Sequence, residues 1–373
     1  MKKLVLPFRV KRPVLACGAD LKGAFALAKG RDAYLFEGFG DLSDLDNFTR
    51  YEKAVKMAEE KLKINPQIVV CDLHPGYFST QFAESYPLSA KHYTLFKIQH
   101  HEAHIASAIV DNDIKGDVLG VAFDGTGYGL DGNIWGGEFF AGNIRSLKRV
   151  AHLGYIPMPG GEACIKEPWR MAASYLYSIS KNRDRHHFSG RTADRKMVSV
   201  PIFIKDMIDK KINSPLTSSV GRLFDAAGSL ILDKKAAEFE AQLPIELEGI
   251  ADKDEGGYYD FDLKKQNGTI IVNMAGTIRG ILRDLDKKTP SPRISAKFHN
   301  TVAFMILKMA KRFNFKKIAL SGGVFQNRFL SRMARQLLEE HGFEVYTHSN
   351  IETNDSGIPI GQIAIANARY VCA

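Results

Sequence analysis

The first part of the chain alternates short apolar runs with glycines and charged residues. Three runs separated by tight turns predict an antiparallel meander of short strands. They lie at residues 13–18, 23–28 and 32–36. Apolar side chains at helical spacing predict a helix over residues 42–62. Residues 68–72 form a continuous apolar run ending in a polar residue, which is typical of a strand buried on both faces. Residues 93–98 repeat that pattern before an expected helix from Gln99.

The same order of elements returns further along. An apolar run at residues 117–124 predicts a buried strand, residues 125–132 a glycine-rich turn, and residues 134–142 a returning strand. A third strand is expected near residues 147–153, followed by helices and loops up to about residue 310. The chain then closes with a strand, a helix, a strand and a helix. These are expected from residue 317, at 327–341, at 343–346 and at 358–370.

Three antiparallel strands followed by alternating helices and strands, used twice, is the plan of the actin-like ATPase superfold. That α/β fold has two ribonuclease-H-like lobes around a nucleotide and metal cleft. We assign residues 1–115 to the first lobe and 116–373 to the second, which carries a helical insertion at about 165–290. The last helix is a candidate to pack back on the first lobe. A fold by itself limits the function without fixing it.

Composition narrows the class of protein. Hydrophobic residues make up 45% and charged residues 25% of the 373, as in ordinary globular proteins. No apolar run is long enough to span a membrane, and the N-terminal run is too short for a signal peptide. The four cysteines form no C-x-x-C pair, which argues against a thiolate zinc site and indicates a reducing compartment. We therefore expect a cytoplasmic protein.

The formal charge of +9 has two interpretations, a mildly basic surface or an attraction to anionic partners. Part of the excess is local, because residues 181–196 hold six lysines or arginines. That segment lacks apolar periodicity and is typical of a solvated loop. Charge alone does not choose between the interpretations, and we do not expect a nucleic-acid partner.

A pair of histidines is the first candidate for chemistry. His100 and His104 are four residues apart, so on a helix both imidazoles face one side and can reach one ion. His101 also precedes His104 by three, so spacing does not choose the pair, and ordinary helix histidines are the alternative. Asp124 ends an apolar strand and Asp355 precedes the last helix. Two imidazoles and two carboxylates suit Fe, Mn or Zn.

Two glycine-rich turns are candidate nucleotide contacts. Residues 127–132 match G-x-G-x-x-G, but a strand follows instead of a helix, so a dinucleotide fingerprint is rejected. Gly125 and Gly127 instead permit a hairpin whose backbone N–H groups face a phosphate, a plain hairpin being the alternative. Gly322 and Gly323 lie between a buried strand and a helix, where a ligand can approach the backbone. A tight turn is the alternative there, and no P-loop motif occurs.

Further polar residues accompany these turns. Asn327 is expected either to cap the following helix or to bind the ligand. Gly221 starts another helix on which Asp225 could bind ribose hydroxyls, and Glu246 is a second candidate for that role. Taken singly, each is more often a surface carboxylate. Two cations near a glycine pair, Lys166 and Arg170, are candidates to bind an anion. The alternative for Arg170 is an ion pair with a local carboxylate.

Six short motifs occur along the chain in a fixed order. They are Gln99-His-His-Glu-Ala-His, Phe123-Asp-Gly-Thr-Gly-Tyr-Gly, Glu167-Pro-Trp-Arg-Met-Ala, Val220-Gly-Arg-Leu-Phe-Asp-Ala, Leu320-Ser-Gly-Gly-Val-Phe-Gln-Asn and Asn354-Asp-Ser-Gly-Ile. In these motifs and their order the chain resembles, over nearly its whole length, the C-terminal lobe pair of the HypF carbamoyltransferase family of [NiFe]-hydrogenase maturation. That lobe pair is itself related to the tRNA threonylcarbamoyladenosine synthase.

The resemblance implies roles for individual residues. It implies ATP or carbamoyl adenylate as the nucleotide and one divalent metal (Fe, Zn or Mn), with Mg²⁺ a candidate companion of the nucleotide. The implied metal ligands are His100, His104, Asp124 and Asp355. The implied nucleotide loop is Gly322, Gly323 and Asn327, and the implied ribose side is Asp225 and Glu246.

The resemblance also implies a reaction. The family makes carbamoyl adenylate from carbamoyl phosphate and ATP and moves the carbamoyl group to the C-terminal cysteine of the partner HypE. We expect this chain to carry the transfer step and an adenylate-forming module, in cis or in trans, to supply the adenylate. His101 is a candidate local base, with Lys166 and Arg170 holding anionic groups. Cys372 invites comparison with the accepting cysteine, a stray terminal residue being the alternative.

Two other functions stay open. One is a threonylcarbamoyladenosine-type transferase acting on tRNA, which would bind tRNA with a steep salt dependence. The other is a catalytically silent nucleotide-binding partner protein. Turnover with an acceptor thiol would exclude the second.

Overall fold

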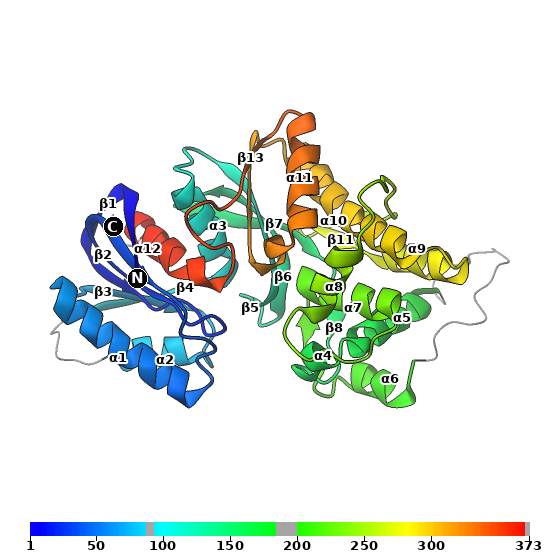
Figure 1. Ribbon diagram of the computed structural model, residues 1–373, viewed down its shortest axis with the longest axis horizontal. Coiled ribbons are helices and arrows are strands. Elements are labelled where there is room, and N and C mark those ends of the chain that lie inside the picture. The colour runs from blue at the N-terminus through cyan, green and yellow to red at the C-terminus, as the bar shows by residue number, and fades with distance from the viewer. Residues whose placement is uncertain (87–92, 184–199, 370–373) are drawn as a thin grey trace.

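The computed structural model describes residues 1–86, 93–183 and 200–369. The chain forms two lobes, each built on its own β-sheet, which lie side by side in Figure 1. Most of the basic segment 181–196, from residue 184 on, and Cys372 lie outside the described residues.

The first lobe has a four-stranded sheet in the order β2-β1-β3-β4. Strand β1 (Lys2–Ala16) pairs antiparallel with β2 (Phe25–Phe36) and parallel with β3 (Ile68–Asp72), which pairs parallel with β4 (Thr94–Ile98). Helices α1 (Leu45–Leu62) and α2 (Phe78–Glu84) complete this part.

The predicted three-stranded meander of the first lobe is wrong, because two long strands take its place. The polar residues 29–32 lie inside β2, the edge strand, where charged side chains can remain in water. Gly30 adopts a φ of 66° there, and the pairing with β1 shifts register on either side of Val10. A bulge in one strand thus produces the sequence pattern of a turn.

The second lobe contains the predicted meander. Strands β5 (Val118–Tyr128), β6 (Ile134–Asn143) and β7 (Ser146–Leu153) are antiparallel neighbours. Strand β12 (Lys317–Ser321) pairs parallel with β5, and β13 (Glu344–Tyr346) pairs parallel with β12. This is the ribonuclease-H-like order, and with the similar plan of the first sheet it confirms the predicted fold class.

A hairpin inside the expected helical insertion was not predicted. Strands β10 (Asp262–Gln266) and β11 (Thr269–Asn273) form it, and β11 pairs with β7, so it extends the main sheet. Two short strands, β8 (Ile156–Pro157) and β9 (Leu216–Thr217), lie off the main path. The lobe boundaries given above remain predictions.

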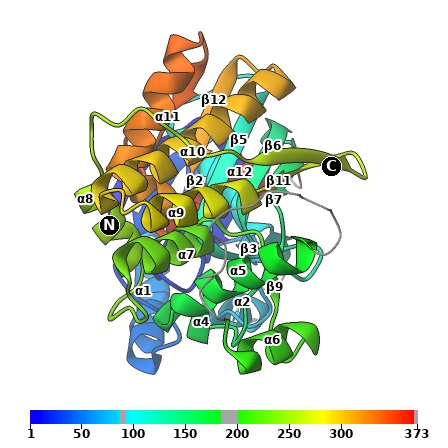
Figure 2. The ribbon, with the colours of Figure 1, turned by 90° about the vertical axis from the view of Figure 1, so that its right-hand side faces the viewer.

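Helices cover one side of the second sheet, as Figure 2 shows. The longest of these helices is α10 (Ser291–Phe313). Its apolar residues form part of the main hydrophobic core of the second lobe, and they include Phe298, Val302, Met305 and Met309. The second lobe contains the helices α4 (Ala163–Lys166), α5 (Trp169–Arg183), α6 (Ile202–Asp209), α7 (Val220–Leu232), α8 (Gln242–Ile250), α9 (Ala275–Asp286), α10 and α11 (Arg328–Glu340), some of which pack on other helices instead of on the sheet.

Two helices join the lobes. Helix α3 (His100–Asp111) contributes buried residues both to the core of the first lobe and to a cluster with β5 and β6. Helix α12 (Ile358–Arg369), red in Figure 1, lies among the strands of the first lobe although it ends the described chain. A side chain at Gly361 would meet the Ala103 carbonyl oxygen at 1.9 Å, so α12 and α3 touch backbone to backbone.

A side-chain amide fixes α12 to the first lobe. The buried Gln362 accepts a hydrogen bond from the Gly18 N–H (2.9 Å) and donates one to the Gly18 carbonyl (3.0 Å). Both backbone groups of Gly18 are thus satisfied by a residue 344 positions away.

Candidate metal and nucleotide site

Helix α3 begins at the centre of the candidate site. The side chain of Gln99 caps it by accepting a hydrogen bond from the Glu102 N–H at 2.9 Å. The first residue of the helix, His100, and His104 one turn later are buried, with ring centroids 5.0 Å apart. The cap therefore fixes where the helix starts and hence which imidazoles face the second lobe.

Two carboxylates meet these histidines. The Nε2 of His104 lies 2.8 Å from Oδ2 of Asp124 and 3.4 Å from Oδ1 of Asp355. The Nε2 of His100 lies 3.5 Å and 3.6 Å from the same two oxygens. Asp124 stands where the regular pairing of β5 with β6 breaks, and Asp355 opens a short 3-10 helix before α12. One ligand atom from each of the four lies within 4.8 Å of the others.

The charges of this group depend on one another. Burial lowers the pKa of His100, but Asp355 and Asp72 outweigh it and hold that pKa well above its usual value. Burial raises the pKa of Asp355, but His100 and His104 lower it to about 2. The same histidines hold the pKa of Asp124 well below its usual range. The histidines and carboxylates thus keep one another charged in a buried place, and a bound cation could take the place of the imidazole protons.

Asp72 completes the cluster and was missed as a site residue. Its Oδ2 lies 2.8 Å from Nδ1 of His100, and its Oδ1 accepts the His74 N–H at 2.9 Å. Both Asp72 and His100 side chains are fully buried. A sequence signal existed, because Asp72 ends the apolar strand β3 as Asp124 ends the apolar run of β5.

The donor set fits a divalent metal ion. The Nε2 of His100 is buried and has no hydrogen-bond partner, as expected of a nitrogen that is a free ligand atom. Two imidazole nitrogens and two carboxylate oxygens suit Fe, Mn or Zn, and a carboxylate behind one histidine is common at metal sites.

His101 lies beside the cluster in a defined state. The Gln99 amide oxygen accepts from Glu102, so the amide nitrogen is a donor, and it bonds both the Tyr128 carbonyl (3.1 Å) and Nδ1 of His101 (3.0 Å). Burial holds the pKa of His101 well below its usual value. The neutral ring therefore carries its proton on Nε2, which is buried without a partner. A proton on Nε2 favours His101 as a hydrogen-bond donor over His101 as a general base. The catalytic role of His101 stays a prediction.

The glycines of the hairpin turn allow close packing at this place. A side chain at Gly127 would meet the His101 ring at 2.4 Å, and one at Gly221 would meet the α-carbon of Gly125 at 2.8 Å. Their lack of a side chain lets β5, α3 and the start of α7 approach one another. Their contact with a nucleotide stays a prediction.

The loop after β12 lies on the other side of Asp124. Gly322 has a φ of 104°, and a side chain there would meet the Phe123 carbonyl oxygen at 2.2 Å. A side chain at Gly323 would lie 3.0 Å from Oδ1 of Asp124. The predicted nucleotide loop and the candidate metal ligands are therefore neighbours.

Asn327 caps α11 in this structure. Its Oδ1 accepts the Leu330 N–H at 2.8 Å, and its Nδ2 lies 2.9 Å from Nε2 of His299. His299 donates from Nδ1 to the Ser295 carbonyl, so its Nε2 is an acceptor. Of the two roles expected for Asn327, the cap is present, and ligand binding stays a prediction.

The candidate ribose residues differ in burial. Asp225 is 3% exposed beside Arg222, and burial raises its pKa to about 6 against the opposing effect of Arg222. Glu246 forms an ion pair with Lys234 (2.7 Å) and accepts a hydrogen bond from Gln242, so it is engaged at the surface. Their ribose roles are untested.

The two candidate anion-binding cations also differ. Arg170 pairs with the local carboxylate of Glu167, which is the alternative raised from the sequence. Lys166 is exposed at the end of α4. Their catalytic roles stay predictions.

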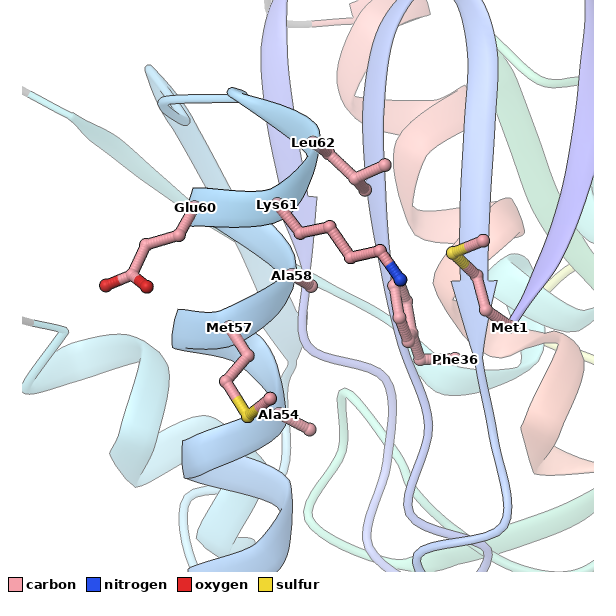
Figure 3. Close-up of a pocket in the computed structure, with 8 residues that line it drawn as sticks. All are labelled: Met1, Phe36, Ala54, Met57, Ala58, Glu60, Lys61 and Leu62. Atoms are coloured by element: carbon pink, nitrogen blue, oxygen red, sulfur yellow. The ribbon is translucent and has the colours of Figure 1, made fainter.

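A groove lies away from this cluster, between α1 and β2, with a volume of about 590 Å³ (Figure 3). Its lining is mostly apolar, including Met57 and Phe36, and also contains Glu60 and Lys61. None of its lining residues is a candidate site residue.

Comparison with known proteins identifies the family. The sequence pattern described as "Carbamoyltransferase, Kae1-like Domain, second subdomain" matches residues 120–362, and that described as "HypF Kae1-like domain" matches residues 9–111. The first pattern alone covers more than half of the chain. The chain belongs to the HypF carbamoyltransferase family. The resemblance inferred from the six motifs is thereby confirmed.

Individual HypF proteins align over nearly the whole chain. Carbamoyltransferase HypF of Synechocystis is 32% identical over 99% of this chain and 49% of its own length. A carbamoyltransferase HypF homolog of Cupriavidus necator is 32% identical over 95% of this chain and 91% of its own length. The chain thus spans about half the length of the Synechocystis relative.

A solved HypF structure has the same fold. The crystal structure of full-length HypF in the phosphate- and nucleotide-bound form superposes with a TM-score of 0.87 and 36% identity, over 98% of this chain and 57% of the other. Nucleotide binding is thus a property of a close structural relative. Within the described residues, no helix is both long and apolar enough to cross a bilayer.

Proposed function

We propose that this chain transfers a carbamoyl group from carbamoyl adenylate to the C-terminal cysteine thiol of a HypE-like partner, in the synthesis of the hydrogenase cyanide ligand. One observation carries the proposal. The cluster of His100, His104, Asp124 and Asp355 lies directly beside the Gly322–Gly323 loop. A candidate metal site and a candidate nucleotide turn therefore lie side by side, and the relatives named carbamoyltransferase support the chemistry.

The reaction needs no nucleophile from this chain. The acceptor thiolate attacks the carbamoyl carbon, a C–S bond forms, the bond to the phosphate oxygen breaks, and AMP leaves with the electron pair. A divalent ion held by the four ligands would supply Lewis acidity toward substrate oxygens. The glycine turn positions the nucleotide through its backbone, and burial of the cluster excludes water from the reactive anhydride.

Supply of preformed carbamoyl adenylate tests the proposal. With a peptide ending in cysteine, the purified chain should release AMP and form a thiocarbamate on the peptide, and a peptide ending in serine is the matched control. Carbamoyl phosphate and ATP without another protein should give no adenylate, because we assign that step to a separate module. AMP release that is independent of any acceptor, or transfer to tRNA in place of the thiol, would contradict the proposal.

A further inference from the structure

The start of α7 is hydrogen-bonded to the backbone of Asp124, one of the candidate metal ligands. The Ser219 hydroxyl accepts the Arg222 N–H at 3.0 Å and donates to the Asp124 carbonyl at 2.6 Å. Gly221 packs on Gly125 at the same place. The position of Arg222 is therefore set by the backbone of a candidate metal ligand.

The guanidinium of Arg222 is buried, and two of its nitrogens, Nε and NH1, have no hydrogen-bond partner among the described residues. Its side chain is 5% exposed, and NH1 lies 3.1 Å from Oδ2 of Asp225. That contact lacks the alignment of a hydrogen bond, because Nε and NH1 of Arg222 and Oδ2 of Asp225 are all buried without a partner among the described residues. An ion pair out of water is costly unless its polar atoms are hydrogen-bonded, so stability alone does not account for this pair.

The third nitrogen of the guanidinium, NH2, lies toward Gly125, the residue after a candidate metal ligand. NH2 lies 3.4 Å from the place where a side chain on Gly125 would begin, and the Gly125 N–H is bonded to the Asp124 carboxylate. Because Gly125 has no side chain, it places only backbone atoms between NH2 of Arg222 and the Asp124 carboxylate. Another nitrogen of the same guanidinium, NH1, faces Asp225, the candidate ribose ligand. A group between ribose and metal in a bound adenylate is the α-phosphate.

Accordingly, we propose that Arg222 is a binding residue for the phosphate of the nucleotide, held in place by Asp225. The inference rests on the proposed function in that it takes an adenylate as the ligand. A planar guanidinium offers parallel N–H donors that match phosphate oxygens, and desolvation strengthens such bonds. In carbamoyl transfer the same contact stabilises the AMP that leaves.

Binding of AMP and of adenosine to the purified chain, measured by calorimetry, tests this role. Arg222→Gln should weaken AMP binding about 10- to 100-fold, the range of one or two charged hydrogen bonds, and adenosine binding less than twofold. Arg222→Lys should fall between, since it keeps the charge and loses the fork. Arg279→Gln, an exposed arginine of α9, is the matched control and should change neither.

A second comparison guards against misfolding. Arg222→Gln leaves Asp225 buried without its cation, so Arg222→Gln with Asp225→Asn, both neutral and of similar shape, is compared with Asp225→Asn alone. The loss specific to AMP should persist between those two. Equal weakening of AMP and adenosine, or unchanged AMP affinity in a folded variant, would overturn the role of Arg222. A wild-type chain that does not bind adenosine would instead overturn the proposed function.

Discussion

The Nδ1 of His100 lies 2.8 Å from a carboxylate oxygen of Asp72, with both side chains fully buried. Because a carboxylate only accepts hydrogen bonds, Nδ1 carries a proton, and Nε2 faces the cluster, where a bound metal ion would replace its proton. The relationship joins the carboxyl end of β3, an interior strand of the first sheet, to the candidate metal site. It makes Asp72 a positioning residue for a ligand that α3 supplies.

Asp72→Asn should weaken metal binding about 10- to 100-fold while leaving the four ligands in place. The amide can accept the His100 proton through its oxygen but adds no charge, so imidazole basicity falls. Metal affinity measured by competition with a chelator checks this. Asp32→Asn, at an exposed ion pair with Lys3, is the control. Equal affinities in wild type and Asp72→Asn would show that the contact is structural only.

Replacing either ligand histidine by alanine should remove most of the bound metal, whereas His101→Ala should not. The reason is that the Nε2 atoms of His100 and His104 face both carboxylates, while His101 is bonded to Gln99. Metal analysis of the purified variants is the measurement. Full occupancy in the double variant His100→Ala, His104→Ala would sink the ligand assignment.

His101→Gln should keep more transfer activity than His101→Ala, because glutamine retains an N–H donor near the position of Nε2. A base would be lost equally in both variants. Nitrogen NMR of imidazole-labelled protein offers a check without activity, since it distinguishes the two neutral tautomers. A proton found on Nδ1 would contradict the hydrogen-bond assignment around Gln99.

Gly323→Val should weaken both nucleotide and metal binding in a folded protein. The valine side chain would begin 3.0 Å from the Asp124 carboxylate, so it would crowd both the glycine loop and a candidate metal ligand. Gly249→Val, at a helix position with open space around it, is the control for a valine in place of glycine. An unchanged affinity for ATP would count against the loop as a nucleotide site.

Acid should destabilise the protein through His299. Burial lowers its pKa to about 4, whereas the unfolded chain titrates near 6.5. The unfolded state therefore binds a proton that the folded state does not as pH falls from 6.5 to 4, and stability falls over that window. The full effect is about 3 kcal/mol. Urea unfolding with chelator present, at several pH values, should give a shallower acid loss for His299→Gln. If the stability of wild type and of His299→Gln fell in parallel with pH, His299 would be excluded as the origin of the acid loss.

Part of the fold followed directly from the sequence. The apolar runs that form β3, β5 and β12 are each buried on both faces, so their apolar composition matches their interior place in the sheets. The first-lobe meander failed because charged residues on an edge strand have the same pattern as a turn. The β10–β11 hairpin was missed because β10 is mostly exposed and carries few apolar residues.

The site divides in the same way. His100, His104, Asp124 and Asp355 could be proposed together because helical spacing and strand ends place polar groups at sheet edges. The burial of Arg222 beside Asp225 could not be predicted, since whether a cation is desolvated depends on the packing between α7 and β5. Hydrogen bonding around His101 depends likewise on a cap that sequence alone does not orient.

The position of α12 sets an order of events during synthesis on the ribosome. Chains are made from the N-terminus, and the sheet of the first lobe is complete as a sequence by residue 98, yet its core includes residues of the last helix. The backbone groups of Gly18 gain their hydrogen-bond partner, the side-chain amide of Gln362, only after residue 362 has been made. A nascent chain stalled before residue 355 would have both histidines and no Asp355, so the proposed four-ligand metal site could form only after residue 355 has been made.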